Sequence, residues 1–163
     1  MGWDLNVLAY DPYVAQERFD QLGATRVDLD TLLRESDFVS LHVVITPETR
    51  KMISEPQLRL MKKNSYLINT ARGDAVDEMA LYRALNEDWI EGAALDVFDP
   101  EPPDPDNPLF TLDSGRLILT PHNVAGSDAS RAGNQRLALE NVLAILGGSL
   151  PRQYIKNPQV LSS

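Results

Sequence analysis

Three polar side chains, Arg72, Glu101 and His122, each follow a separate apolar run, and together they suit proton transfer beside a bound anion. An arginine can hold a carboxylate through two parallel hydrogen bonds. A carboxylate beside an imidazole favours the charged imidazolium, so Glu101 is expected to make His122 a general acid near neutral pH. These residue types predict a site that holds a small carboxylate and supplies a proton.

Each of these residues also has a structural interpretation. Arg72 could be a surface arginine that pairs with Asp74 or Asp77, and a histidine that follows a proline, as His122 does, is often structural. For His42 a structural role is favoured, because nothing acidic lies near it in its motif. The catalytic interpretation gains weight from position, since the carboxyl ends of parallel strands meet at one edge of a sheet.

Two further carboxylates, Asp11 and Asp96, also stand at the ends of predicted strands. Asp11 ends the first predicted strand, in the run NVLAYDPY, and an acid at the end of the second strand of a dinucleotide fold binds the adenine ribose hydroxyls and repels the extra phosphate of NADP. The alternative for Asp11 is a turn, which an aspartate before a proline commonly opens. Asp96 lies just past another strand end, where it could converge with Glu101 and His122.

Hydrophobic patterning predicts the elements that position these residues. Short apolar runs predict strands buried on both faces at 6–11, 38–44, 65–71, 92–98 and 117–120. Helical spacing predicts helices at 13–22, 31–36, 55–62, 77–88 and 127–146, the last with an apolar stripe through Leu139, Val142, Leu143 and Leu146. The alternation predicts an α/β fold with a mostly parallel sheet, and the proline-rich stretch 100–108 predicts an extended surface loop.

Composition excludes several classes of protein. The 163 residues are 43% hydrophobic and carry a net charge of −9, which favours one globular domain and argues against nucleic acid or anionic lipid as a partner. No apolar run approaches the ~20 residues of a membrane span, and no signal peptide is evident, so a cytoplasmic location is expected. Without cysteine, and with His42 and His122 far apart, no metal site is expected.

Five runs, in chain order, resemble the D-isomer-specific 2-hydroxyacid dehydrogenases: LAYDPY, SLHVVITPETRKMI, MKKNSYLINTARGDAVDEMAL, IEGAALDVFDPEPP and ILTPHNVAGSD. The resemblance covers nearly the whole chain. It implies a Rossmann-like fold, NAD as cofactor and a small 2-keto or 2-hydroxy acid as substrate. It also implies that 1–150 is a partial dinucleotide-binding domain and that 151–163 is a C-terminal tail.

The resemblance further implies a role for each site residue. Arg72 would bind the substrate carboxylate and polarise the keto oxygen, His122 would protonate that oxygen as hydride arrives, and Glu101 would hold His122 protonated. Asp11 would take the adenosine ribose and Asp96 would meet the nicotinamide amide. The remaining implied cofactor contacts are Val43, Val44, Thr49, Thr70, Ala71 and Ala125.

Three features depart from the family pattern. Val44 stands where relatives usually have a proline, and HNVAG is one residue longer than the usual motif after the histidine. The glycine-rich turn G-x-G-x-x-G is missing, because no two glycines of the chain are separated by a single residue. We therefore expect an incomplete fold that lacks the family's first strand and its pyrophosphate-binding turn.

The missing strand predicts a gap in the sheet. In the order 3-2-1-4-5-6 the first strand lies in the middle. Taking 6–11 as strand 2 and 65–71 as strand 4, we expect the sheet to close directly between them, to borrow a strand from another copy, or to belong to a longer protein. Exposed strand edges favour a homo-oligomer.

The most favoured function is therefore the cofactor-domain portion of an NAD-dependent D-2-hydroxyacid dehydrogenase. We expect no NADH turnover by this chain alone with glyoxylate, hydroxypyruvate or pyruvate. The alternative is a non-catalytic dinucleotide-fold module used for protein association or regulation, although the presence of Arg72, Glu101 and His122 together argues against it.

Overall fold

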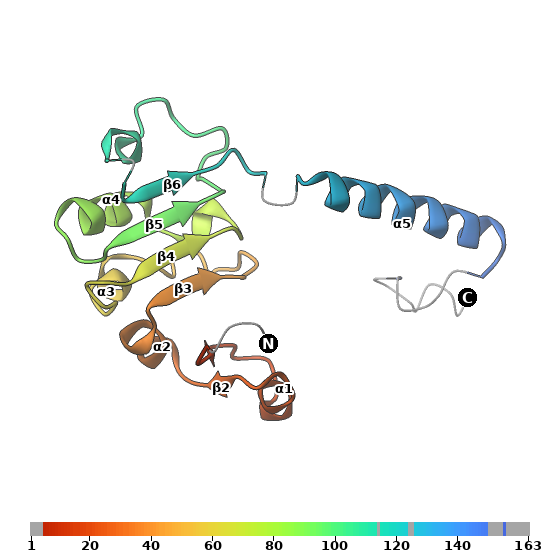
Figure 1. Cartoon of the computed structure of the whole chain (residues 1–163), viewed down its shortest axis with the longest axis horizontal. Coiled ribbons are helices and arrows are strands. Elements are labelled where there is room, and N and C mark those ends of the chain that lie inside the picture. Colours follow the sequence, from red (N-terminus) through yellow and green to blue (C-terminus); the bar gives the residue numbers. More distant parts are fainter. Residues whose placement is uncertain (1–4, 114, 124–125, 150–154, 156–163) are drawn as a thin grey trace. The chain divides into compact units, whose positions relative to one another are not determined.

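The chain forms two compact units, Met1–His122 and Asn123–Ser163 (Figure 1). This computed structural model describes residues 5–113, 115–123, 126–149 and 155. The predicted tail 151–163 therefore lies outside the described residues except for residue 155, and the expected domain limits stay a prediction. No helix among the described residues is long and apolar enough to cross a membrane.

A parallel sheet of four strands, in the order β3-β4-β5-β6, forms the centre of the first unit. Its strands are β3 (Phe38–Leu41), β4 (Tyr66–Asn69), β5 (Gly92–Leu95) and β6 (Leu117–Leu119), and their arrows run the same way in Figure 1. A second parallel pair joins β1 (Leu8–Ala9) to β2 (Thr25–Arg26). The predicted α/β, Rossmann-like fold with a mostly parallel sheet is confirmed.

The prediction that the segment 65–71 borders a gap in the sheet is wrong. The segment 65–71 contains β4, which pairs with β3 on one side and β5 on the other. On this side of the sheet the edge strand is β3, which pairs only with β4 in the described part of the chain. Direct closure between 6–11 and 65–71 does not occur, because β3 already supplies the backbone partners on that side of β4.

Strand β2 was not predicted, because neither of its residues is buried and no apolar run marks it. The strand follows Gly23, whose φ of +68° lets the chain leave the preceding helix in the left-handed conformation that glycine favours. Thr25 N–H then donates to Val7 O at 2.8 Å and Val27 N–H donates to Ala9 O at 3.0 Å. Backbone hydrogen bonds place this strand, and the Arg26 side chain adds contacts with Asp11 O and the Phe19 ring.

The predicted burial of the strands on both faces holds best for β5. In β3 and β4, buried and more accessible residues alternate, so these strands have one covered face. Phe38 and Tyr66 stack on the accessible side with ring centroids 5.4 Å apart. The expectation was too strong for β3 because an edge strand packs its side chains against fewer neighbours.

The helices of the first unit are α1 (Gln16–Leu22), α2 (Leu29–Glu35), α3 (Glu55–Leu58) and α4 (Glu78–Asn86), with the short 3-10 helices η1 (Gly73–Ala75) and η2 (Pro108–Thr111). Two of these helices, α2 and α4, begin where an aspartate side chain accepts from free backbone donors. Asp28 caps α2 and Asp77 caps α4 by accepting backbone N–H bonds. Helix α1 begins later than predicted, because Tyr13 N–H and Val14 N–H donate to Asp11 instead of entering a helix.

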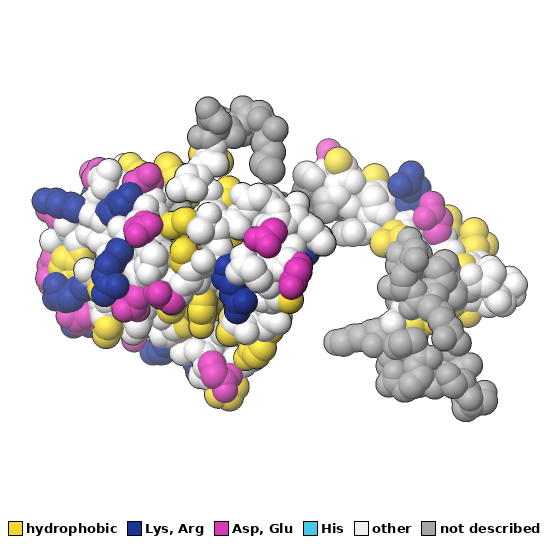
Figure 2. All heavy atoms as spheres, turned by 90° about the horizontal axis from the view of Figure 1, so that it is seen from below, with side chains coloured by type: hydrophobic (Ala, Val, Ile, Leu, Met, Phe, Trp, Pro, Cys, Tyr) yellow, Lys and Arg dark blue, Asp and Glu magenta, His cyan; other side chains and the backbone are white. Residues whose placement is uncertain are grey.

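The core lies between the strands and helices α2 to α4. Leu33, Leu58, Leu67 and Leu81 are fully buried there, one each from α2, α3, β4 and α4. Arg116 fastens the end of α4 to the sheet, since its guanidinium donates to Leu85 O and Ile90 O at 2.6 Å each, to Glu91 O at 3.0 Å and to the Asp88 carboxylate at 2.6 Å. On the face shown in Figure 2, basic, acidic and apolar side chains are interspersed.

The second unit contains α5 (Asp128–Leu146), which Ser127 caps by accepting from Ser130 N–H. The predicted stripe residues Leu139, Val142, Leu143 and Leu146 are all exposed, and so are Leu137 and Ile145. The four stripe positions follow the i, i+3, i+4, i+7 spacing of one helix face, so the predicted stripe is present on α5.

Candidate active site at the carboxyl edge of the sheet

The three predicted catalytic residues lie in the loops that leave one edge of the sheet. The register pairs Asn69 of β4 with Leu95 of β5, and Leu95 with Leu119 of β6, so these strands end level with one another. Arg72 follows β4, Glu101 follows β5 and His122 follows β6. This is the edge at which parallel sheets bind ligands.

Glu101 and His122 form a direct pair. His122 Nδ1 lies 2.8 Å from Glu101 Oε2, and the other carboxylate oxygen accepts the Phe98 N–H at 3.0 Å. His122 has a φ of +50°, a strained conformation for a residue with a side chain, of the kind that concentrates at functional sites. With Nδ1 held by the carboxylate, Nε2 is the ring nitrogen available to a substrate.

The pKa of Glu101 is lowered from its ordinary value, first by the hydrogen bond from the Phe98 backbone N–H and then by the hydrogen bond from His122. The charges of His122 and Arg72 lower it further, while burial acts in the opposite direction. Glu101 is therefore an anion near neutral pH, and its carboxylate holds the His122 ring at Nδ1. The effect of Arg72 also places its guanidinium within electrostatic reach of the pair.

Arg72 does not take the structural role that was its alternative. Asp74 pairs with Arg50 at 2.6 Å, and Asp77 pairs with Lys51 at 3.5 Å while capping α4. The Arg72 guanidinium donates to Ala71 O at 2.7 Å and makes no ion pair with any described residue. It is exposed and can take a carboxylate ligand.

Asn69 shapes the loop that carries Arg72, although the sequence reasoning did not single it out. It is buried at the last position of β4, where its amide donates to Arg72 O at 2.8 Å and accepts from Ala71 N–H at 3.1 Å. The available signal was an amide ending an otherwise apolar strand. Thr70 and Ala71, predicted on the nicotinamide side, are half-buried in this loop.

Gly73 allows the Arg72 loop to touch the segment that leads to Glu101. A Cβ atom at this position would lie 2.0 Å from the backbone carbonyl of Phe98, so any side chain would push the two loops apart. The glycine is thus required by close approach of two backbones.

Asp96 ties the strand ends together below the catalytic loops. It is 2% exposed, accepts a 2.5 Å hydrogen bond from the Thr120 hydroxyl, and its N–H donates to Asn69 O at 3.0 Å. The carboxylate therefore links the ends of β5 and β6 at the level where the nicotinamide amide was expected.

The remaining predicted cofactor contacts lie apart from this cluster in sequence. Thr49 closes the turn after β3 by donating to Val44 O at 2.7 Å, Val43 packs against the core, and Val44 is 76% exposed. Ala125 lies outside the described residues.

Asp11 lines a pocket of about 660 Å³ beside β1 and β2. Both interpretations of this residue meet here, because its carboxylate accepts Tyr13 N–H at 2.8 Å and Val14 N–H at 3.1 Å, as a turn opener does, and the residue also lines the pocket. The other lining residues are Tyr10, Pro12, Arg26, Val27, Asp28 and Thr31. The turn thus holds the carboxylate in a defined orientation at the pocket wall.

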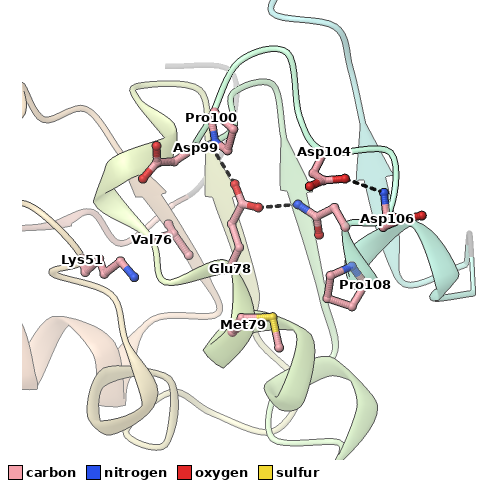
Figure 3. Close-up of a pocket in the computed structure, with 10 residues that line it drawn as sticks. Lys51, Val76, Glu78, Met79, Asp99, Pro100, Asp104, Asp106 and Pro108 are labelled. Atoms are coloured by element: carbon pink, nitrogen blue, oxygen red, sulfur yellow. Dashed lines mark hydrogen bonds between the residues drawn. The ribbon is translucent and has the colours of Figure 1, made fainter.

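A second hollow of about 270 Å³ lies between α4 and the proline-rich loop (Figure 3). Glu78 stands at its centre and accepts hydrogen bonds from Asp99 N–H at 2.8 Å and from the Asn107 amide at 2.5 Å. The pKa of Asp99 is raised, first by a hydrogen bond with the Asp74 carboxyl group and then by burial and the Asp74 charge, against the charges of Arg50 and Lys51. The sequence reasoning did not single out Glu78.

Comparison with known proteins identifies relatives of this chain. Residues 1–124 match the family model of the D-isomer specific 2-hydroxyacid dehydrogenase NAD binding domain. The chain is 43% identical over 159 residues to a glyoxylate reductase of Korarchaeum cryptofilum (98% of this chain, 47% of that protein). It is 41% identical over 160 residues to a D-3-phosphoglycerate dehydrogenase of Methanocaldococcus jannaschii (98% of this chain, 30% of that protein).

Solved structures of related dehydrogenases also match the chain. An NAD-complexed D-isomer specific 2-hydroxyacid dehydrogenase from Lactobacillus delbrueckii ssp. bulgaricus matches with a TM-score of 0.77 and 37% identity, over 90% of this chain and 47% of that one. A D-lactate dehydrogenase from Aquifex aeolicus, complexed with NAD and lactic acid, matches with a TM-score of 0.76 and 38% identity, over 90% of this chain and 47% of that one. The chain spans about half the length of these relatives, or less.

Proposed function

Because the chain belongs to the D-isomer specific 2-hydroxyacid dehydrogenase family, we propose that it is the cofactor-domain portion of an enzyme that interconverts 2-keto acids and D-2-hydroxy acids. The observation that carries this proposal is the 2.8 Å pair of His122 and Glu101, which lies within electrostatic reach of Arg72. The matched domain is an NAD-binding one, and its cofactor is NAD.

The described residues fit the two ends of NAD. Asp11 lines a pocket large enough for a ribose, and a carboxylate there would accept hydrogen bonds from the ribose hydroxyls. Val43, Val44 and Thr49 would flank the adenosine half. Thr70, Ala71 and Asp96 follow β4 and β5 at the edge where the nicotinamide would lie, and Ala125 would complete the contacts.

The chain's own residues supply binding and proton transfer. Arg72 would hold the substrate carboxylate through two parallel hydrogen bonds and orient the keto oxygen toward His122. NAD, when bound, supplies or accepts the hydride. His122 would deliver a proton from Nε2 to the keto oxygen during reduction and take it back during oxidation, while Glu101 holds Nδ1 and stabilises the imidazolium.

We also propose that this chain alone does not turn over, since it contains no Gly-x-Gly turn for the pyrophosphate and spans about half of its relatives. The open edge of β3 favours association with other protein, a second copy included. A homo-oligomer and a cytoplasmic location stay predictions.

A titration of the isotopically labelled chain with glyoxylate, followed by NMR of the histidine rings, tests the proposal. The chain has only two histidines, so His42 serves as the internal reference for His122. We expect glyoxylate to shift the His122 ring signals, and Arg72→Ala to abolish this shift while Arg34→Ala, at an exposed arginine on α2, leaves it unchanged.

An equal response in Arg72→Ala, or no response of His122 at any glyoxylate concentration, would contradict the proposed site and favour the non-catalytic module. A parallel assay monitors NADH with glyoxylate, hydroxypyruvate and pyruvate. Steady NADH oxidation by the isolated chain would overturn the proposal that it does not turn over.

A further inference from the structure

The loop that presents Glu101 has few means of holding itself in place. Between Asp99 and Asn107 it contains Pro100, Pro102, Pro103 and Pro105, none of which has a backbone N–H to donate. The internal hydrogen bonds lie at its far end, where Asp106 N–H donates to the Asp104 carboxylate and Asn107 N–H to Asp104 O, each at 2.9 Å. In the half that contains Glu101, Phe98 N–H holds the Glu101 carboxylate, and the loop backbone itself is held from outside through Asp99 N–H.

Glu78 holds both ends of this loop from α4. One carboxylate oxygen accepts the Asp99 N–H at 2.8 Å and the other accepts the Asn107 side-chain amide at 2.5 Å, as Figure 3 shows. The side-chain oxygen Oδ1 of Asn107 in turn accepts Leu109 N–H and caps η2. One carboxylate thus connects the first turn of a helix to the entry and the exit of the loop.

The anchor is rigid because α4 is packed into the core immediately after Glu78. Ala80 and Leu81 are buried, and Asp77 caps the helix by accepting from Met79 N–H and Ala80 N–H. Gly73 lets the Arg72 loop press against the Phe98 backbone on the other side of the same segment. The peptide of Asp99, two residues before Glu101, is therefore clamped between two fixed parts of the fold.

We propose that Glu78 is a positioning residue, which fixes the proline-rich loop so that the Glu101 carboxylate meets His122 Nδ1. The inference rests on the proposed function, because it gives Glu78 a role only through the Glu101–His122 pair. Glu78 lies in the wall of the second hollow and touches neither member of the pair directly.

The two bonds of Glu78 allow a test by exchange of hydrogen-bonding groups. In Glu78→Gln the new side chain has one acceptor oxygen and one donor amide group, but it faces two donors, Asp99 N–H and the Asn107 amide. One of the two hydrogen bonds is therefore lost. Adding Asn107→Asp restores the match, since the glutamine oxygen can accept from Asp99 N–H while its amide donates to the new carboxylate. That carboxylate still accepts Leu109 N–H, so the cap of η2 is retained.

The readout is the position of the proton on the neutral His122 ring, measured by ¹⁵N NMR above the pH at which the ring titrates. In wild type we expect the proton on Nδ1, donated to Glu101. In Glu78→Gln we expect the ratio of Nδ1-protonated to Nε2-protonated ring to fall about tenfold, the effect of losing one charge-assisted hydrogen bond. The double variant Glu78→Gln with Asn107→Asp is expected to recover the wild-type ratio.

Two controls separate positioning from general damage. Glu87→Gln makes the same chemical change at the other end of α4, where the carboxylate contacts only the Trp89 indole among the described residues, and should leave the ratio unchanged. Amide exchange of Asp99 reports the Glu78 bond itself and should accelerate in Glu78→Gln. The His42 ring should not respond to any of these changes.

The outcomes distinguish the two proposals. An unchanged His122 ratio in Glu78→Gln, with faster Asp99 exchange, would overturn the role of Glu78 and leave the Glu101–His122 pair intact. Failure of the double variant to recover the ratio, when it folds like wild type, would also overturn it. A wild-type ring without a proton on Nδ1 would overturn the pair itself, and with it both proposals.

Discussion

The loops beyond β4, β5 and β6 and the region around β1 and β2 belong to the same compact unit, yet they are held together very differently. Polar side chains lock the first region: Asn69 binds the Arg72 loop, Asp96 binds Thr120, and Glu101 binds Phe98 and His122. In residues 5–28, by contrast, the strands are two residues long and the buried side chain is Phe19.

The contrast shows that the loops of Arg72, Glu101 and His122 are fixed by groups within the described residues. The strands that precede these loops pair with one another. Asp11 lines a pocket beside β1 and β2, but β1 pairs only with β2 in the part of the chain that the structure describes. We therefore expect the two regions to differ in stability as well as in structure.

The largest test of this difference is a matched pair of leucine truncations. Leu67→Ala, at a fully buried position of β4, should cost about 3 to 4 kcal/mol of unfolding free energy because it leaves a cavity in the core. Leu8→Ala, at a half-buried position of β1, should cost about 1 kcal/mol or less. Urea unfolding measures both, and equal losses would remove the distinction between the regions.

A smaller loss of unfolding free energy is expected when the hydrogen bonds of Arg116 to the end of α4 are changed. Arg116→Lys removes the planar fork that reaches Leu85 O, Ile90 O and Glu91 O together, and should cost about 2 kcal/mol. The control is Arg34→Lys, whose exposed pair with Asp30 should change stability by less than about 0.5 kcal/mol. A thermal melt that ranks the two variants equally would show that the guanidinium geometry at Arg116 does not matter.

The smallest effect concerns the pH dependence of stability at Glu101. Its pKa is lowered on folding, so its stabilising contribution is present above the ordinary pKa of a glutamate, about 4.3, and is lost as the pH falls through the lower folded value. Glu101→Gln should therefore be less stable than wild type near pH 7, and the difference should shrink on acidification. Glu91→Gln, at an exposed glutamate, is the matched control; a difference for Glu101→Gln that stays constant down to pH 2 would contradict this prediction.

Much of the fold was predictable because periodicity marks buried elements. The five strands expected from apolar runs each contain an observed strand, and the five helical segments each overlap an observed helix, although α2 begins at Leu29, before the predicted 31–36. The short strand at Thr25 was missed, since an exposed strand held by backbone bonds leaves no hydrophobic signal. The segment 65–71 was wrongly expected at an edge of the sheet, because the residues of a strand do not determine its position in the strand order.

The sequence alone determined that Arg72, Glu101 and His122 are candidates for anion binding and proton transfer. It did so through their residue types and their positions after apolar runs. Only the tertiary structure decided that Glu101 and His122 pair at 2.8 Å across 21 positions of sequence, and that Asp74 and Asp77 take other partners and leave Arg72 unpaired among the described residues. The physical reason is that these contacts depend on strand register, a close backbone approach at Gly73 and the hold of Glu78 on a proline-rich loop. Such long-range geometry has no counterpart in local sequence pattern.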